Sequence, residues 1–225
     1  MISVIIPALN EERALPTTLR AVLAQRGDYE VIVVDGGSSD RTCEIARGEP
    51  RVRLVTASRG RASQMNAGAR HARGEWLLFL HADTTLPCNA LERVNALETE
   101  SRCEAGGFHH CFSGNHWGLR FISWMHNLRC RLTTVFYGDQ AMFVRRGLFE
   151  QLGGFPEQPI LEDVLFCEKL REVTRPVLLD DCVVTDSRKF EQMGVWGSLW
   201  RVVLILTCHE LGLPITGRVF FSPIR

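Results

Sequence analysis

The sequence shows no excess of charge of either sign and no stretch that would divide it into domains. Its 225 residues include 26 Lys and Arg against 26 Asp and Glu, interspersed along most of the chain. Proteins that bind DNA or RNA usually gather Lys and Arg on one face, so we expect no nucleic-acid partner. Because no linker rich in Pro, Gly or Ser interrupts the chain, we predict a single domain over residues 1–225.

Cysteine pairs at the short spacings of metal-binding or redox motifs are also absent. The eight cysteines are scattered singly, at positions 43, 88, 103, 111, 130, 167, 182 and 208. Zinc and redox motifs place two cysteines only a few residues apart. We therefore predict that most of these cysteines are reduced residues of the core.

No apolar run in the sequence is long enough to cross a bilayer, which takes about 20 residues. The first run, residues 2–6, ends at Pro7 and follows no basic segment, so it does not resemble a signal peptide, and we expect a cytoplasmic location. Residues 195–213 are also apolar but are interrupted by Arg201 and Glu210. We expect a helix there that packs against the domain or a partner, as in a homodimer, in preference to one that lies on the inner face of a membrane.

Strand and helix patterns alternate through the first hundred residues. Four short apolar runs without polar alternation are predicted strands, at 2–6, 30–34, 52–55 and 76–80. Three segments with helical patterns lie between them, at 15–23, 39–47 and 61–73. Strands joined by helices pair in parallel, so we predict an α/β fold with a mostly parallel central sheet and helices on both faces.

The second half of the sequence is less regular. Residues 137–144 and 177–184 are predicted strands, and residues 146–152 and 162–173 are predicted helices. The segment 106–132 is rich in His, Trp, Phe and Gly without a clear period, so no element is predicted there. A less parallel arrangement is expected for this half.

Polar residues follow three of the predicted parallel strands. Pro7 and Asn10 follow the first, Asp35 follows the second, and His81 and Asp83 follow the fourth. Ligands of such sheets bind beyond the carboxyl ends of the strands, so we expect the three loops to converge on one crevice. A lone Asp at such a position is commonly a turn residue or a helix cap, but two along one sheet edge favour a binding site.

The residue types at this edge suit a phosphate and a metal ion. Asp83 offers a hard carboxylate, and Mg²⁺ or Mn²⁺ bound by it would be completed by substrate phosphates. The turn at Gly36 precedes one helix and Arg61 begins another, so backbone donors and a cation are available to a diphosphate. Glu162 and Asp163 open a further helix, where they either stabilise the helix dipole or supply a general base to the crevice.

Four motifs, in their order and spacing, resemble the family 2 glycosyltransferases of GT-A fold. They are Val4-Ile-Ile-Pro-Ala-Leu-Asn-Glu-Glu12, Val33-Val-Asp-Gly-Gly-Ser-Ser-Asp-Arg-Thr42, Asn66-Ala-Gly-Ala-Arg70 and Leu78-Leu-Phe-Leu-His-Ala-Asp83. Segments 138–140, 153–156, 161–164 and 187–189 are similar to the small bacterial subgroup called rSAM/selenodomain-associated transferase 2. The resemblance extends over nearly the whole chain.

This resemblance implies an enzyme that moves a sugar from a nucleotide-diphosphate sugar to an acceptor hydroxyl with inversion. A UDP-sugar is the favoured donor, and lipid-linked molecules are among the candidate acceptors. Residues 1–100 would form the nucleotide-sugar-binding half, residues 101–190 the acceptor and catalytic half, and residues 191–225 an apolar C-terminal helix and tail.

The resemblance also assigns roles to individual residues. Asp163 would be the catalytic base with Glu162 beside it, and Arg188 would face the leaving diphosphate. Asp83 would hold the metal ion, Mg²⁺ or Mn²⁺, although His81 replaces the first carboxylate of the family's DxD motif. The nucleotide-sugar would contact the remaining candidates, which are Pro7, Asn10, Glu11, Asp35, Gly36, Arg61, Asn66, His81, Ala82, Asp139 and Gln140.

Other functions fit the sequence less well. A dinucleotide-binding dehydrogenase needs a glycine turn after its first strand, where Pro7 stands, and a haloacid-dehalogenase-type phosphatase needs a nucleophilic Asp in place of His81. A sugar nucleotidyltransferase is the alternative enzyme, although the first loop lacks the Gly-rich, basic signature that grips a triphosphate. A catalytically silent sugar-nucleotide-binding module at a membrane or partner surface is the alternative from a different class.

Overall fold

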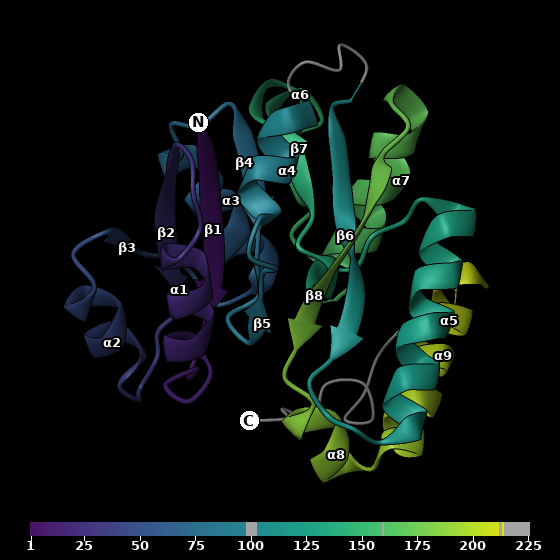
Figure 1. Ribbon diagram of the computed structural model, residues 1–225. Coiled ribbons are helices and arrows are strands. Elements are labelled where there is room, and N and C mark those ends of the chain that lie inside the picture. The colour runs from purple at the N-terminus through teal and green to yellow at the C-terminus, as the bar shows by residue number, and fades with distance from the viewer. Residues whose placement is uncertain (98–102, 159, 212, 214–225) are drawn as a thin grey trace.

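The computed structural model describes residues 1–97, 103–158, 160–211 and 213. The strands in this part of the chain form one eight-stranded sheet in the order β3-β2-β1-β4-β7-β6-β8-β5. Helices lie on both faces of its N-terminal half (Figure 1). The predicted α/β class is therefore confirmed.

Four parallel strands make up the N-terminal half of the sheet. They are β1 (Ile2–Ala8), β2 (Tyr29–Asp35), β3 (Val52–Thr56) and β4 (Trp76–Phe79). β1 lies between β2 and β4, and β3 pairs with the other edge of β2. Every residue of β1 is buried because its side chains alternate between two apolar layers, with Val4 and Ile6 in one layer and Ile5 in the other.

The two apolar layers hold the helices against the sheet. One layer includes buried residues of α1 (Leu15–Leu23), α2 (Thr42–Gly48) and α4 (Ala90–Ala96). The other includes buried residues of α3 (Arg61–His71), α6 (Arg146–Gln151) and α7 (Glu162–Val173). The helix predicted over 39–47 begins only at Thr42, because Asp40 instead accepts hydrogen bonds from the backbone N–H groups of Thr42 and Glu12.

The C-terminal half of the sheet is mixed, as the sequence predicts. It contains β5 (Thr84–Thr85), β6 (Ala105–Phe112), β7 (Phe143–Arg145) and β8 (Val177–Thr185). β7 is antiparallel to both β4 and β6, and β8 is parallel to β6 but antiparallel to β5. This half brings β6 and β8 beside the helices of the C-terminal region (Figure 1).

Two segments differ from the sequence predictions. Residues 106–132, for which no element was expected, contain most of β6 and of α5 (Trp117–Thr133). The strand expected over 137–144 is wrong in its first part, which forms the short 3₁₀ helix η2 (Gly138–Gln140). Ala141 has a φ of 45°, in the left-handed region, so the chain turns before β7 begins.

The C-terminal region adds a pair of helices outside the sheet. A short helix, α8 (Arg188–Met193), leads into α9 (Val195–Glu210), which lies against α5 (Figure 1). Leu119 and Ile122 of α5 and Val195 of α9 form a small buried apolar cluster. The apolar helix predicted over 195–213 is therefore present, and it packs on α5.

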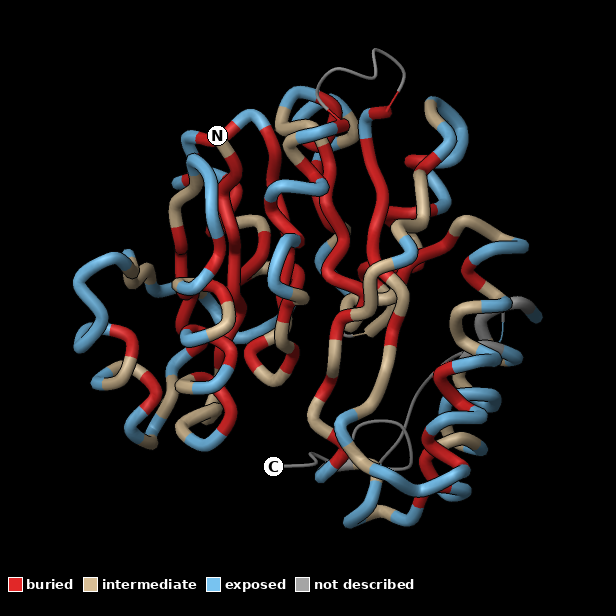
Figure 2. Tube along the Cα trace, in the orientation of Figure 1, coloured by how far each residue is buried: buried red, intermediate tan, exposed pale blue. Residues whose placement is uncertain are grey.

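The outer surface of this helix pair remains apolar. Trp117 is 65% exposed, Trp124 is 58% exposed and Trp200 is 74% exposed. Figure 2 shows this contrast, with buried residues concentrated along the strands and many exposed residues on α5 and α9. Within the part of the chain that the structure describes, no helix combines the length and the apolar character needed to span a membrane.

Cys111 and Cys182 form a disulfide that links β6 to β8. The expectation of reduced cysteines is wrong for this pair, because 71 positions separate the two residues and only the pairing of β6 with β8 brings them together. The other six cysteines form no disulfide, so most are reduced as predicted, but only three of them are buried, at positions 103, 130 and 167.

Candidate active site

The loops after β1 and β2 are joined by hydrogen bonds at one end of the sheet. The backbone N–H of Asn10 donates to Ser38 Oγ (2.9 Å), and the Asn10 side-chain oxygen accepts from the backbone N–H of Ser39 (2.8 Å). The backbone N–H of Glu11 donates to Thr42 Oγ1 (2.8 Å). Asn10 has a φ of 56°, which Asn tolerates better than most residues, so these bonds hold the loop in an uncommon conformation.

Asp35 ends β2 and organises the turn that follows it. Its carboxylate accepts hydrogen bonds from the backbone N–H groups of Gly37 (2.9 Å) and Ser38 (3.1 Å). Burial alone would raise the pKa of Asp35, but hydrogen bonds from Ser38 and Gly37 outweigh that effect and lower it. Asp35 is therefore an ionised carboxylate at the strand end, only 4% exposed.

Gln64 of α3 closes the back of these loops. Its amide nitrogen donates to the carbonyl oxygens of Ala8 and Val34, both at 2.8 Å. A Cβ atom on Gly36 would lie only 2.9 Å from the Gln64 side chain, so glycine is needed for this close packing. Gln64 is not among the predicted site residues, and its bonds to two strand ends become visible only in the structure.

A cavity of about 240 Å³ lies at the carboxyl ends of the parallel strands. Six of its lining residues are among those predicted to form the site, namely Pro7, Glu11, Arg61, His81, Ala82 and Asp83. Arg59 and Gly60 also line it, and no pattern in the sequence indicated either. Two of the three predicted strand-end loops, those after β1 and β4, therefore meet at this space, which we call the donor cavity, whereas the loop at Asp35 does not line it and is joined to the first loop by hydrogen bonds.

Asp83 also lines a second, adjoining space of about 180 Å³. Arg13 of the first loop and Asp186 after β8 contribute to it, and neither was predicted. The backbone N–H of Asp186 donates to the Asp83 carbonyl (2.9 Å), and Arg188 Nε lies 2.6 Å from Asp186 Oδ2. Arg188 is thus connected to the surroundings of Asp83 through Asp186.

An ion pair connects the donor cavity to α7. Arg61 Nε lies 2.8 Å from Glu162 Oε1, with Arg61 48% exposed and Glu162 2% exposed. Burial raises the pKa of Glu162, and the charge of Arg61 opposes that rise. Burial alone would lower the pKa of Arg61, but the carboxylates of Glu162, Asp163 and two further residues raise it. The start of α7 is therefore linked to the donor cavity through Arg61.

Asp163 is held by two backbone N–H groups. Its Oδ2 accepts from Gly138 (2.6 Å) and its Oδ1 accepts from Val164 (2.8 Å), and the residue is 7% exposed. Gly138 in turn packs closely on His81: a Cβ atom added at position 138 would lie only 2.3 Å from His81 Nε2. Gly138 therefore contacts both His81 and Asp163 and links the two side chains.

The charge state of His81 follows from this packing. Burial is the largest influence and lowers its pKa, and the charge of Arg61 lowers it further against the opposing carboxylates of Asp83, Asp139 and Asp163. His81 is therefore a neutral imidazole. It contributes no negative charge at the position of the missing DxD carboxylate.

Three of the predicted site residues lie elsewhere. Asn66 uses its amide to bind the backbone N–H and carbonyl of Phe155, at 2.9 and 2.8 Å, and lines a different cavity with Arg70. Gln140 is fully buried, and its amide nitrogen donates to the Phe108 carbonyl (3.2 Å). Asp139 does not line the donor cavity and lies between two histidines, although its charge still acts on His81 and Arg61.

Comparison with known sequences gives a consistent family match. The sequence profile of Glycosyl transferase family 2 matches residues 3–153. The chain is 36% identical over 166 residues to a PGL/p-HBAD biosynthesis glycosyltransferase of Mycobacterium bovis, covering 69% of this chain and 63% of the relative. Human dolichyl-phosphate beta-glucosyltransferase is 36% identical over 99 residues, covering 36% of this chain and 31% of the relative. The match thus spans about two thirds or less of these curated relatives.

Solved structures share the fold at low sequence identity. A mannosyltransferase from Pyrobaculum calidifontis, in complex with GDP-Man and Mn²⁺, has a TM-score of 0.71 and 21% identity, over 99% of this chain and 67% of that one. A TarS fragment from S. aureus in complex with UDP-GlcNAc has a TM-score of 0.67 and 21% identity, over 83% of this chain and 58% of that one. The likeness confirms the GT-A fold, and with the profile match over most of its length it shows that the chain belongs to glycosyl transferase family 2.

Proposed function

We propose that the protein transfers a sugar from a nucleoside-diphosphate sugar to an acceptor hydroxyl, with inversion at the anomeric carbon. The observation that carries this proposal is the ion pair between Arg61 at the donor cavity and Glu162 beside Asp163. Through this pair, the buried Glu162 carboxylate lies next to the donor cavity. The cavity is lined by Asp83, whose carboxylate can bind a metal ion, and by two positively charged side chains, Arg59 and Arg61. Donor binding and base catalysis are thereby adjacent.

The nucleoside would bind where the first two loops meet. Asp35, an ionised acceptor at the end of β2, would take hydrogen bonds from the base or ribose, and Pro7 and Glu11 would form the wall beside it. Asn10 and Gly36 would act by fixing the shape of these loops. Since the loops are already hydrogen-bonded to each other, little ordering would be required when the donor binds.

The diphosphate would lie between Asp83 and the start of α3. Arg59 and Arg61 supply positive charge there, and the backbone at Gly60 begins an eleven-residue helix whose positive end faces the cavity. Asn66 and Gln140 are left out of this proposed set, because the protein itself uses both amides.

The residues at this position fit a divalent cation of the Mg²⁺ or Mn²⁺ type. Asp83 presents a carboxylate to the donor cavity, and one carboxylate with substrate phosphates is a common ligand set for these ions. A cation bound there would neutralise charge that develops on the leaving diphosphate. The positive charge of Arg61 would also stabilise the negative charge on the leaving diphosphate. Arg188 would do the same from its position beside Asp186.

The chemical step would use Asp163 as the general base. Its carboxylate would take the proton of the acceptor hydroxyl while that oxygen forms a bond to the anomeric carbon and the bond to the diphosphate oxygen breaks. The N–H groups of Gly138 and Val164 hold the carboxylate in place, and Glu162 positions α7 through Arg61.

We infer that the acceptor is apolar, and that a lipid-linked acceptor is the best match. An apolar cavity of about 250 Å³ lies between α5 and α9, with Phe112, Ile122 and Leu199 in its wall. Arg129 and Tyr137 line its polar end, and Arg129 Nε and Nη2 are buried without a hydrogen-bond partner among the described residues. Relatives include an undecaprenyl-phosphate 4-deoxy-4-formamido-L-arabinose transferase of Edwardsiella ictaluri, 34% identical over 104 residues.

A lipid-linked acceptor would require the protein to contact a membrane. An exposed apolar surface on α5 and α9, which includes Trp124 and Trp200, would contact the cytoplasmic face of a membrane where the acceptor is held. Homodimer formation through the same surface is the competing use of residues 195–213. Sedimentation with and without liposomes separates the two, because only membrane contact moves the monomer to the vesicle fraction.

The experiment that tests the proposed function is a panel of nucleotide-sugars incubated with the protein and Mg²⁺ or Mn²⁺, with a glycolipid that carries free sugar hydroxyls, held in vesicles, as acceptor. Release of a nucleoside diphosphate supports the proposal, with UDP from a UDP-sugar as the expected product. Release of pyrophosphate from a nucleoside triphosphate and a sugar phosphate would instead identify a nucleotidyltransferase. Donor binding without any release would identify a binding module.

A further inference from the structure

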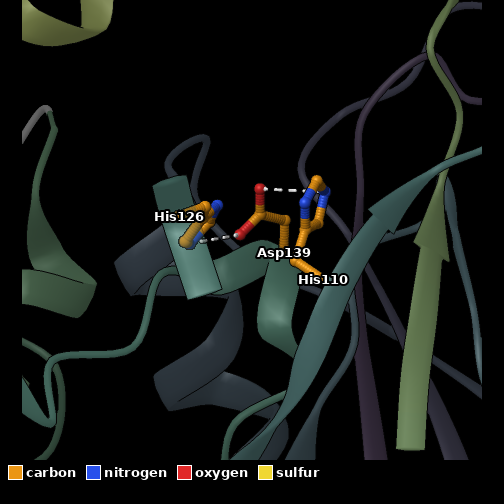
Figure 3. Close-up of side chains that lie close together, drawn as sticks. All are labelled: His110, His126 and Asp139. Atoms are coloured by element: carbon orange, nitrogen blue, oxygen red, sulfur yellow. Dashed lines mark ion pairs between the residues drawn. The ribbon is translucent and has the colours of Figure 1, made fainter. Parts of the chain in front are cut away.

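Three potential metal ligands from separate elements meet beside the apolar cavity. They are His110 of β6, His126 of α5 and Asp139 of η2, and Figure 3 shows the carboxylate between the two imidazole rings. His110 Nε2 lies 3.5 Å from Asp139 Oδ2, and His126 Nε2 lies 3.7 Å from Asp139 Oδ1. The three ligand atoms lie within 4.8 Å of one another.

These separations are too long for hydrogen bonds but suit ligands of one metal ion. Ligand atoms at about 2.0–2.2 Å from a tetrahedral Zn²⁺ lie about 3.4 Å apart. The two N to O distances in the cluster, 3.5 and 3.7 Å, are close to that value, and they go to different oxygens of Asp139, so each carboxylate oxygen faces one imidazole. Because one ligand atom from each residue lies within 4.8 Å of the other two, rotation of the side chains would bring all three to a common centre.

Two polar atoms of the cluster make no hydrogen bond within the described part of the chain. His110 Nε2 and Asp139 Oδ1 are buried and have no hydrogen-bond partner among the described residues. His110 has no exposed surface at all. A buried polar atom without a partner is unfavourable, and Figure 3 shows that one oxygen of the Asp139 carboxylate is directed toward each imidazole ring.

The protein orients His110 as metal-bound histidines are usually oriented. Its other ring nitrogen, Nδ1, lies 3.4 Å from Ser123 Oγ, which leaves Nε2 to face Asp139. Asn127 fixes the backbone of the same residue, accepting from its N–H (2.8 Å) and donating to its carbonyl (2.9 Å). Such bonds behind a histidine ligand fix its ring and its tautomer.

His126 can also turn to a metal without leaving a buried group unpaired. Its Nε2 lies 3.0 Å from Gln140 Oε1. That oxygen also accepts a hydrogen bond from the backbone N–H of Tyr137 (3.1 Å), so it keeps a partner if His126 is released.

We propose that His110, His126 and Asp139 bind a divalent transition-metal ion, with Zn²⁺ as the best match to two imidazoles and one carboxylate. His126 and Asp139 line the apolar cavity, so an open coordination position would face the space assigned to the acceptor. This site is separate from Asp83, which is not part of the cluster. The proposal does not depend on sugar transfer, since metal binding alone tests it.

The test begins with the full chain, purified without a metal-affinity tag and analysed for zinc by mass spectrometry. We expect about one Zn²⁺ per chain, and a loss of affinity of at least ten-fold in H110Q, H126Q and D139N. Two variants serve as controls that should keep the ion. H109Q changes the neighbouring histidine of β6, and D83N changes the donor cavity. Equal zinc content in the cluster variants and in the wild type would overturn the assignment.

A second measurement needs no variant and so does not depend on their folding. The chelator-treated wild-type chain is titrated with Co²⁺, and its visible spectrum is recorded. Saturable ligand-field bands at one equivalent, without thiolate charge-transfer bands, are expected for nitrogen and oxygen ligands. Thiolate bands would assign the metal to a cysteine instead, and the absence of saturable binding would show that His110 and Asp139 form only an ion pair.

Discussion

Arg61 and Glu162 connect the first turn of α3 to the first turn of α7, with 2.8 Å between Arg61 Nε and Glu162 Oε1. The first helix begins at the donor cavity, and the second carries Asp163. Because Glu162 is 2% exposed, its carboxylate depends on Arg61 for compensation of its charge. The pair therefore fixes the position of the proposed base relative to the proposed donor site.

Replacing Arg61 should affect both stability and turnover. R61Q leaves Glu162 buried without its cation, so we expect the free energy of unfolding to fall by about 1–3 kcal/mol, less than for a fully buried pair because Arg61 is half exposed. The value of kcat/KM should fall as well, because α7 loses its link to the donor cavity. Urea unfolding and a nucleotide-release assay measure the two effects.

Two further variants act as controls for R61Q: R61Q/E162Q removes both partners of the ion pair, and R41Q removes one partner of an exposed pair. The double variant removes the unpaired carboxylate and should recover part of the lost stability. Arg41 forms an exposed pair with Glu44, at 3.0 Å, so R41Q should leave the free energy of unfolding nearly unchanged. A double variant less stable than R61Q would contradict the assignment of Glu162 as a buried partner.

The pH dependence of stability should report the environment of Glu162. Burial raises the pKa of this carboxyl above its ordinary value of 4.5, so the folded state holds the proton more tightly than the unfolded state. Its contribution is therefore favourable below pH 4.5 and is lost as the pH rises through the raised pKa. Relative to E162Q, the wild type should lose stability across that interval, as followed by urea unfolding at several pH values. A relative gain would mean that the pKa is lowered.

Gly138 should tolerate no side chain. In G138A the new Cβ would lie 2.3 Å from His81 Nε2, so the His81 ring or the η2 backbone must move, and with it the N–H that holds Asp163. We expect a loss of about 1–3 kcal/mol in unfolding free energy and at least a ten-fold loss in kcat.

The control for this prediction is G147A. Position 147 lies in α6, and a Cβ atom added there would have no neighbouring atom within 4 Å, so alanine should be neutral or slightly stabilising. The double variant H81A/G138A removes the steric conflict and should regain stability without regaining full activity. Wild-type activity in G138A would show that Gly138 does not position the base.

The disulfide between Cys111 and Cys182 can be tested by counting the thiols of the protein before and after reduction. Six cysteines are free in the structure, so alkylation of the denatured, unreduced protein should modify six thiols, and eight after reduction. Because the bridge closes a loop of 71 residues, C111S/C182S should lower the free energy of unfolding by about 2–4 kcal/mol. The exposed free Cys88 supplies the control variant C88S, which should leave stability nearly unchanged.

Much of the N-terminal half could be predicted because three of its four strands, β1, β2 and β4, are largely buried. A strand such as β1, with every residue buried, appears in the sequence as an unbroken apolar run and has clear ends. Asp35 and Asp83 then follow from position alone, since each comes shortly after a run of this kind. The helix α7 was predicted with the bounds that the structure shows, at 162 and 173.

The segment 106–132 could not be predicted, for two physical reasons. β6 contains Gly106 and Gly107, which usually weaken a strand, but here a Cβ would lie 2.3 Å from the Val177 carbonyl oxygen and 2.4 Å from Phe136. α5 carries exposed apolar side chains such as Trp117 and Trp124 as well as buried ones, so it lacks a polar face. Neither a strand nor a helix pattern is then visible.

Some predicted contacts of the site depend on residues distant in the sequence. The helical pattern of α3 places Asn66 correctly on the helix but cannot show that Phe155, 89 positions later, takes up its amide. Likewise, the position of Asp139 after a predicted strand start gave no sign of His110 and His126 on either side of it. Such partners are determined by tertiary packing.

The most direct test of the proposed mechanism is the rate of nucleoside-diphosphate release by D163N at saturating donor and acceptor, compared with wild type and with D180N. Asp180 carries an 88% exposed carboxylate on β8 and should have no effect. We predict that D163N lowers kcat by at least about a hundred-fold while its affinity for UDP stays within about three-fold of wild type, because the base acts on the acceptor and not on the nucleotide. A D163N variant that retains the wild-type kcat would contradict the assignment of Asp163 as the base, and with it the proposed mechanism.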